Sequence, residues 1–526
     1  MTNIPVSSKQ NRTIPLPVTS IPPKRPGTAA IIRILALAFV IQQTAVVQAD
    51  SLQAGVAKVD ITHLEAGPIN DRLYVKALLL KNSHQTAVII TIDAVAIAEI
   101  GSIRNDFLNN VRSRLRQTLH IKPTHVLINA SHCHGRVCED IEERTYQAVQ
   151  QAVHNLVPVT IGSGTGHEDR IMENRRLRLK NGTELDVRQA YSLPPDEEIA
   201  GIGPVDPEIG VLKLNRMDGA TLAVIYQFAC HPIQSVPNGG NTADITGFAS
   251  QVIEDNMSKD TVALFLQGCA GDINPAFYKD VNHPRHAEPL GNMLGLSTLK
   301  ALRQITPRRD DRLKVINQVI ELPRADLGQR IHELETQQQA LLHSLKGTFL
   351  NLKTFLILSA KHNISPEYPS FDIGSYLHDK VSGRNDLLHH DDQNRNHLDR
   401  YIQNIYTMEK LTRLQTNLAL LRKHHQNNSN AGSSTISAEL IAMRIGDFVL
   451  ITFPGELTVQ IGLGIKAMSP HPLTFVSGYT NGYLYYSPTA EQLRNVGRAQ
   501  EDSECLLAPE WQAIYEQKVR DLLQQL

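Results

Sequence analysis

Short apolar runs alternate with amphipathic helical segments over residues 53–320, and this alternation constrains the fold more than any other feature of the sequence. The runs are rich in β-branched residues and are bounded by polar or turn residues, as buried strands are. They lie at residues 74–80, 87–92, 124–128, 159–162, 222–228 and 262–266, with helical patterns at 137–155 and 289–305. Strands that alternate with helices predict an α/β protein whose mixed sheet is mainly covered.

Residues 326–434 interrupt this pattern. One apolar face repeats at helical spacing before a polar stretch, and another follows it: Ile331, Leu334, Leu341 and Leu345, then Leu411, Leu414, Leu418 and Leu421. We interpret the region as a helical hairpin inserted into the α/β unit, with a long exposed loop that includes residues 389–392. The two His and two Asp of that loop are assigned no role. Strands resume at 440–444 and 448–453, and a helix closes the chain at 509–526.

The amino terminus has the layout of a secretory signal. A polar, proline-rich stretch precedes about 14 mostly apolar residues at 34–47, and Val47 and Ala49 place small residues before Asp50. We expect residues 1–49 to be a signal peptide cleaved after Ala49, and the product to be secreted or periplasmic. An uncleaved anchor and a start codon placed too early are the alternatives. Residues 50–526 are then expected to form a single large catalytic domain.

Charge and cysteine content exclude several classes of protein. The chain has 52 Lys and Arg against 53 Asp and Glu, so it lacks the basic surface that nucleic acid binding requires. Five Cys in 526 residues do not form a disulfide-dense scaffold. The absence of a CxxC motif disfavours a cysteine-based zinc site, and we expect buried cysteines with at most one disulfide. The 21 His of an exported chain make a histidine-based metal site the first possibility to consider.

Three candidate ligands come directly after predicted buried strands, where a side chain is held rigidly at the mouth of a cleft. His132 belongs to a His-x-His pair with His134, His231 precedes a proline, and Glu456 follows a Pro-Gly turn. Each also has an ordinary interpretation. The histidines can be polar turn residues or satisfied structural residues, and the glutamate can start a helix.

Two further segments carry candidate chemistry. Residues 478–486 contain four Tyr, which either pack along a strand or supply a phenol as a ligand or transition-state donor. Residues 267–275 contain Asp272 and Asn274 after several small residues. Such residues let backbone N–H groups approach a substrate, although a structural turn explains them equally well.

The order of these motifs resembles the neutral (alkaline, non-lysosomal) ceramidase family, over most of residues 54–486. Residues 54–62 resemble its A-G-x-x-x-x-D-I-T start, and residues 131–135 resemble its S/T-H-T-H-S-G segment. Residues 271–275 resemble G-D-V-S-P, and the Pro-Gly-Glu turn and the tyrosine-rich stretch follow in the family's order.

The resemblance implies a hydrolase that cleaves the N-acyl amide of ceramide with one zinc ion per chain. Its implied zinc ligands are His132, His231, Glu456 and Tyr486. We prefer Tyr486 to Tyr483 because it stands eight residues after Gly478, as the ligand does in the family's G-x-x-N-x-Y-x-x-Y pattern.

Three other residues acquire roles from the same resemblance. His134 would line the site, Arg175 would face the substrate, and His134 or Asp272 would move protons. Two imidazoles, a carboxylate and a phenol suit an open zinc site that activates water.

Two departures from the family bear on the substrate. Asn274 stands at the position of the family's serine, so hydrolysis would have to use water activated by zinc, and Asn274 would instead donate to the developing oxyanion. The chain ends at Leu526, so we expect it to lack the family's carboxy-terminal β-sandwich. The alternatives are a zinc hydrolase of a non-lipid amide, ester or lactone, and a non-catalytic binding protein. We expect a small-molecule or lipid substrate and, at most, peripheral membrane contact.

Overall fold

The computed structural model describes residues 15–20, 22, 52–187, 193–235, 240–278, 285–495 and 499–526. The chain divides into two units, residues 1–49 and 50–526. The described residues of the first unit form no helix or strand. The apolar segment and the cleavage site of the predicted signal peptide lie outside the described residues.

The larger sheet of the described residues has eight strands in the order β12-β11-β10-β5-β1-β2-β3-β4. Neighbours β3 and β4 run parallel, as do β11 and β12, and the other neighbouring pairs run antiparallel. This confirms the predicted mixed sheet of an α/β protein. The strands are β1 (Gln53–Asp60), β2 (Tyr74–Lys81), β3 (Thr86–Ile92), β4 (Val126–Ala130), β5 (Val157–His167), β10 (Glu208–Arg216), β11 (Thr221–Phe228) and β12 (Val262–Gln267).

A second sheet packs against the first. Its strands, in order, are β14 (Leu313–Pro323), β15 (Thr435–Ile445), β16 (Phe448–Thr452) and β18 (Thr474–Ser477). Leu78 and Leu212 of the larger sheet share one buried cluster with Met443 and Phe475 of the smaller sheet. The nearly continuous apolar strands follow from this arrangement, because both faces of the central strands are covered.

Helices cover the outer faces of both sheets. The larger sheet is covered by α2 (Phe107–Leu119) and α3 (Ile141–His154) over its β1–β4 half, and by α4 (Asp244–Asp255) and α5 (Ala287–Leu302) over its β10–β12 half. The smaller sheet is covered by α10 (Val459–Met468) and α13 (Trp511–Gln525). Short elements complete the domain: β6 (Met172–Asn174) with β13 (Ile273–Pro275), β17 (Glu456–Leu457) with β19 (Tyr486–Ser487), β7 (Arg176–Leu179) with β8 (Glu184–Asp186) and β9 (Ile199–Ile202), and helices α11 (Ala490–Arg494) and α12 (Gln500–Ser503).

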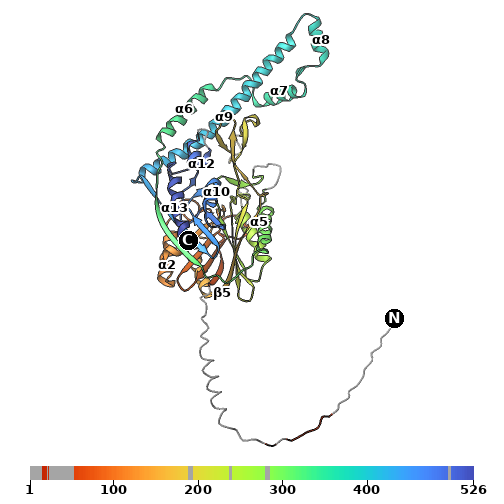
Figure 1. Cartoon of the computed structure of the whole chain (residues 1–526). Coiled ribbons are helices and arrows are strands. Elements are labelled where there is room, and N and C mark those ends of the chain that lie inside the picture. Colours follow the sequence, from red (N-terminus) through yellow and green to blue (C-terminus); the bar gives the residue numbers. More distant parts are fainter. Residues whose placement is uncertain are drawn as a thin grey trace, which may run out of the picture. The chain divides into compact units, whose positions relative to one another are not determined.

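The inserted helices lie between the paired strands β14 and β15. They are α6 (Gly328–Ser344), α7 (Leu352–Ile364), α8 (Ile373–Val381) and the long α9 (Asp386–Asn430), with α7 and α8 beside the amino-terminal part of α9 (Figure 1). Helix α6 packs on the carboxy-terminal part of α9 through Leu334, Leu418 and Leu421. The predicted helical hairpin is therefore present.

The predicted long loop within this hairpin is wrong. Residues 389–392 are helical, as part of α9, and Asp391 is buried where it accepts hydrogen bonds from Ser370 and Tyr376. His389 and His390 are exposed and contact Gln393 and Asn394, one helical turn further along. The Asp- and Asn-rich composition concealed the helix because these residues have weak helix propensity, and the packing of α8 overrides it.

Two further features of the described residues concern membrane-spanning helices and cysteines. No helix among them is both long and apolar enough to cross a membrane. All five cysteines are free, and Cys138 alone among them is not buried, so the single disulfide that we allowed for does not form.

Candidate metal centre

Three buried ligand-type side chains from distant segments converge at one end of the sheets. His132 follows β4, His231 follows β11, and Glu456 begins β17. Nε2 of His231 lies 3.1 Å from Oε2 of Glu456, and Nε2 of His132 lies 3.6 Å from the same oxygen. Among the described residues, these three make the one group of His, Cys, Asp or Glu side chains with the geometry to hold a metal ion.

Backbone carbonyl groups orient both imidazoles. Nδ1 of His132 lies 2.6 Å from the carbonyl oxygen of Val95, and Nδ1 of His231 lies 3.0 Å from that of Ile273. Since a carbonyl group only accepts hydrogen bonds, each Nδ1 must carry the proton. In the neutral imidazole the Nε2 lone pair then faces Glu456. This outer bond to a carbonyl is the arrangement that fixes metal-binding histidines in proteins.

The charge states of these groups favour a bound cation. Burial lowers the pKa of His132 to about 4, so its ring is neutral near pH 7. Burial opposes ionisation of Glu456, but positive charge on His132 or His231 and a hydrogen bond from His231 hold its pKa well below the usual range. With both imidazoles neutral, two lone pairs and a carboxylate meet in a buried space. Such a group of acceptors repels itself unless a cation or a proton lies between its members.

Two tyrosines hold the carboxylate in place. The hydroxyl of Tyr479 donates to Oε2 of Glu456 at 3.2 Å, and the hydroxyl of Tyr483 donates to Oε1. Burial, followed by the charge of Glu456, raises the pKa of both phenols well above the usual value, so they remain donors. Sequence reasoning did not single out Tyr479, and it considered Tyr483 only as the less favoured ligand.

Tyr486 lies directly beside Glu456, because β17 and β19 pair in parallel with these two residues in register. Its ring stacks on that of His231, with 6.5 Å between centroids. His134 is exposed, and its ring centroid is 5.5 Å from that of His132. Both side chains line the same cavity as the three buried ligand-type residues.

Arg175 is buried and also lines this cavity, with its guanidinium carbon 5.5 Å from the ring centroid of Tyr486. Its Nε donates to Glu501 at 2.6 Å, and Nη1 donates to Asn274 at 3.0 Å. Glu501, on α12, is a residue that sequence reasoning missed. The acidic run at 501–504 was a usable signal, because a buried Arg175-Arg176 pair requires carboxylate partners.

Asp272 and Asn274 do not line the cavity. The carboxylate of Asp272 accepts hydrogen bonds from the Val459 backbone at 2.8 Å and from Asn174 at 3.1 Å. Asn274 is buried, and its side-chain oxygen accepts from Arg175. The structure thus places both residues outside the cavity lining, where their hydrogen bonds support the surrounding segments.

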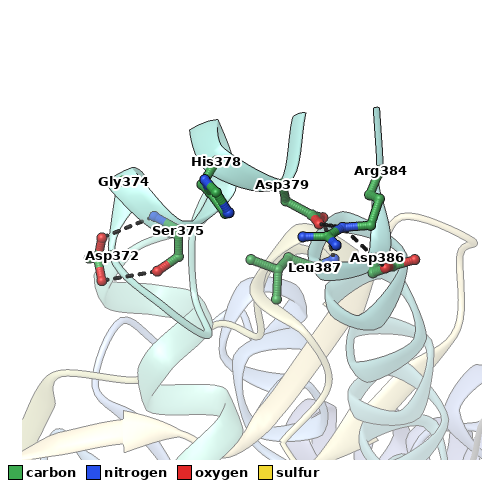
Figure 2. Close-up of a pocket in the computed structure, with 8 residues that line it drawn as sticks. All are labelled: Asp372, Gly374, Ser375, His378, Asp379, Arg384, Asp386 and Leu387. Carbon is green, nitrogen blue, oxygen red and sulfur yellow. Dashed lines mark hydrogen bonds and ion pairs between the residues drawn. The ribbon is translucent and has the colours of Figure 1, made fainter. Parts of the chain in front are cut away.

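The cavity has a volume of about 240 Å³, and both polar and apolar side chains line it. Besides the residues already named, it is lined by Val95, Ile100, Ile233, Tyr278 and Glu504. A larger cavity of about 580 Å³ lies at α8 and the start of α9 (Figure 2), but its one imidazole is that of His378. It contains no group of three ligand-type side chains that could hold a metal ion.

Comparisons with known proteins identify the fold. No family model matches the chain, and no curated protein matches it. Among solved structures, neutral ceramidase from Pseudomonas aeruginosa is similar with a TM-score of 0.56 and 16% sequence identity, over 90% of this chain and 74% of that one. A structure described as ceramidase complexed with C2 gives a TM-score of 0.55 and 15% identity, over 90% and 75% of the two chains. The chain therefore has a ceramidase-like fold.

Proposed function

We propose that this protein is a secreted, zinc-dependent hydrolase of the neutral ceramidase family that cleaves a ceramide-like N-acyl amide. One observation carries the proposal: the Nε2 atoms of His132 and His231 and the carboxylate of Glu456 converge in a buried place, close enough together to hold one metal ion. The ceramidase-like fold and the matching order of the sequence motifs support it. The signal-like segment at residues 1–49 supports secretion.

The donor set fits zinc. Two ligands about 2.1 Å from one tetrahedral zinc ion lie about 3.4 Å apart. The distances from Glu456 Oε2 to the two Nε2 atoms, 3.1 Å and 3.6 Å, bracket that value. His132, His231 and Glu456 would hold the ion, with the phenol of Tyr486 as fourth ligand. When bound, zinc would act as a Lewis acid toward the amide carbonyl and would lower the pKa of water.

The chain's own residues supply the remaining requirements for amide hydrolysis. The buried guanidinium of Arg175 places positive charge at the cavity, where it would bind the substrate's polar head or stabilise a developing oxyanion. His134, exposed at the edge of the cavity, would move the proton that the leaving amine requires. Asn274 offers no nucleophile, and it would keep Arg175 in position.

The direct test combines metal analysis with hydrolysis of a short-chain fluorescent ceramide. We expect about one zinc per chain, and release of fatty acid that a chelator abolishes and added zinc restores. His132→Ala should lose both metal and turnover. His154→Ala, which removes an exposed histidine of α3, is the matched control and should retain them. Zinc below about 0.3 per chain in the unmodified protein, unchanged by His132→Ala, would remove the basis of the proposal.

A second candidate is a hydrolase of the same fold that acts on a smaller, non-lipid amide, ester or lactone. The cavity volume of about 240 Å³ favours it, because pockets for drug-sized ligands usually measure about 300–1,000 Å³. A panel of N-acyl lipids, simple esters and lactones separates the two. Turnover of an ester or lactone without turnover of any N-acyl lipid would select the smaller substrate.

A further inference from the structure

Helix α7 of the insertion exposes an unusual amount of apolar surface. We name as the α7 patch the side chains of Phe349, Leu352, Leu356, Ile357 and Ile364, of which Phe349 is 90% and Ile364 is 85% exposed. No residue of α7 is buried. Single exposed apolar side chains are normal on protein surfaces, but a group of five on one short segment marks an interaction site.

The fold of the insertion makes little use of these side chains: the ring of Phe349 meets that of His397 edge-on, with 5.5 Å between centroids, and Phe349 still remains 90% exposed. Helix α7 contacts α9 through Phe355, whose ring stacks on that of Tyr401 with 4.4 Å between centroids. Leu352, Leu356 and Ile357 remain outside this contact and are about half exposed or more. Helix α7 therefore carries more apolar side chains than its contact with α9 requires, and packing does not explain the apolar residues on its outer surface.

Cationic side chains accompany the patch. Residues 345–365 contain Lys346, Lys353 and Lys361 and no Asp or Glu. All three lysines are exposed, and none forms an ion pair with another described residue. Asp372, which precedes α8, and Asp379 of α8 accept hydrogen bonds from the backbone N–H groups of Ser375 and Leu387.

This combination identifies the partner by its chemistry. A second copy of the chain meeting the same face would place lysines against lysines, which disfavours self-association. The surface of a bilayer with anionic headgroups accepts apolar side chains at the acyl boundary and lysines at the headgroups. With 13 residues, α7 is too short to span a bilayer, which requires about 20, so it would lie in the plane of the surface.

We propose that the α7 patch docks the protein onto a negatively charged lipid surface. The docking surface lies in the insertion, and it involves none of the residues of the candidate metal centre. It is therefore independent of the proposed hydrolase activity.

The test is sedimentation of the full, metal-loaded chain with phosphatidylcholine vesicles that contain about 30% phosphatidylglycerol and no ceramide. We expect Leu352→Ser, Leu356→Ser and Ile357→Ser together to weaken partitioning at least about tenfold. Lys353→Gln with Lys361→Gln should weaken it about twentyfold, and only on anionic vesicles. The control is Leu296→Ser with Val319→Ser, which removes equally exposed apolar side chains from α5 and β14 and should bind as the unmodified chain does.

Two results would overturn the proposal. One is binding of the triple serine variant equal to that of the unmodified chain while the lysine variant loses binding, which would reduce the contact to nonspecific adsorption. The other is an unmodified chain that stays off anionic vesicles. If that chain also forms a dimer that the triple substitution dissociates, the patch belongs to a second copy. Circular dichroism of each variant establishes that it is folded.

Discussion

Nε2 of His231 lies 3.1 Å from Oε2 of Glu456, although 225 positions separate the two residues in the chain. The Nδ1 atom of His231 lies against the carbonyl oxygen of Ile273, so in the neutral ring the Nε2 lone pair faces a carboxylate oxygen in a buried place. Folding brings them together at a cost that a shared cation would offset. The stability of the folded chain should therefore depend on metal.

Glu456→Gln tests this dependence. The amide nitrogen can donate to an imidazole Nε2, so the metal-free variant should be at least as stable as the metal-free unmodified chain. Its zinc affinity should fall at least about a hundredfold, since even residues that only support a ligand contribute tenfold to a hundredfold. Competition with a zinc chelator and thermal unfolding with and without zinc measure the two effects. Glu143→Gln, at a half-buried position of α3 paired with Arg114, serves as the control, and equal zinc affinity in both variants would contradict the prediction.

Gly271→Ala should disturb Glu456 through the backbone. A Cβ atom at position 271 would lie 2.7 Å from the carbonyl oxygen of Glu456 and 2.9 Å from that of Leu457, so β17 must shift. We expect a loss of about 1–3 kcal/mol in the free energy of unfolding and about tenfold weaker zinc binding. Gly464→Ala meets no atom within 4 Å on helix α10 and should be neutral or slightly stabilising. Urea denaturation of both variants measures the change in the free energy of unfolding. Unchanged stability of Gly271→Ala would contradict the prediction.

Tyr486→Phe and Tyr483→Phe separate two roles for a phenol. Tyr483 donates a hydrogen bond to Glu456, so its loss should lower zinc affinity about tenfold and leave the fully zinc-loaded enzyme active. As the proposed fourth ligand, Tyr486 faces the reacting groups, and its loss should lower kcat about a hundredfold or more even at saturating zinc. Steady-state kinetics across a zinc titration distinguishes the two. If the two variants exchange these behaviours, Tyr483 is the ligand.

Glu501→Gln should destabilise the fold by about 3 kcal/mol, because it leaves the buried guanidinium groups of Arg175 and Arg176 without part of their compensating charge. Chemical denaturation measures the loss. Asp140→Asn removes the partner of Arg144 in an exposed pair and should cost less than about 1 kcal/mol. Equal effects of the two substitutions would show that the pair at Arg175 is not buried in solution.

His424→Phe should make the protein less sensitive to acid. His424 is fully buried against the ring of Tyr485, and neither ring nitrogen has a hydrogen-bond partner among the described residues. Burial, with a smaller effect of Lys423, lowers its pKa from 6.5 to about 4. Because the unfolded chain then takes up this proton at higher pH than the folded chain, stability falls as the pH drops from about 6.5 toward 4. Because of this difference in pKa between the folded and unfolded chains, His424 should account for a loss of about 3 kcal/mol in the free energy of unfolding over this pH range.

Phenylalanine keeps the contact with Tyr485 and cannot be protonated. The variant should be at least as stable as the unmodified chain at pH 7, and its stability should decline less between pH 6.5 and 4. Denaturation at a series of pH values tests both statements. A parallel decline in the two proteins would show that His424 is not responsible.

Local sequence pattern predicted the order of the candidate ligands, six of the eight strands of the larger sheet, two of the four strands of the smaller sheet, and helices α3, α5, α6, α9 and α13, but it missed the other helices. A buried strand is apolar and β-branched over its own few residues, and a ligand at its end is recognisable from its immediate neighbours. The pattern failed for residues 389–392, where Asp391 is stabilised by Ser370 and Tyr376 rather than by its own turn of helix. Contacts of that kind leave no periodic trace in the sequence.

The sequence by itself determined an α/β protein with an inserted helical hairpin, and it placed His132, His231 and Glu456 after separate strands. Only the tertiary structure decided that the three side chains meet, which ring nitrogen each histidine presents, and that Tyr479 and Tyr483 donate to Glu456. The physical reason is the distance along the chain over which each kind of interaction acts. Apolar periodicity acts over a few residues, whereas carbonyl and hydroxyl groups from distant segments orient the site.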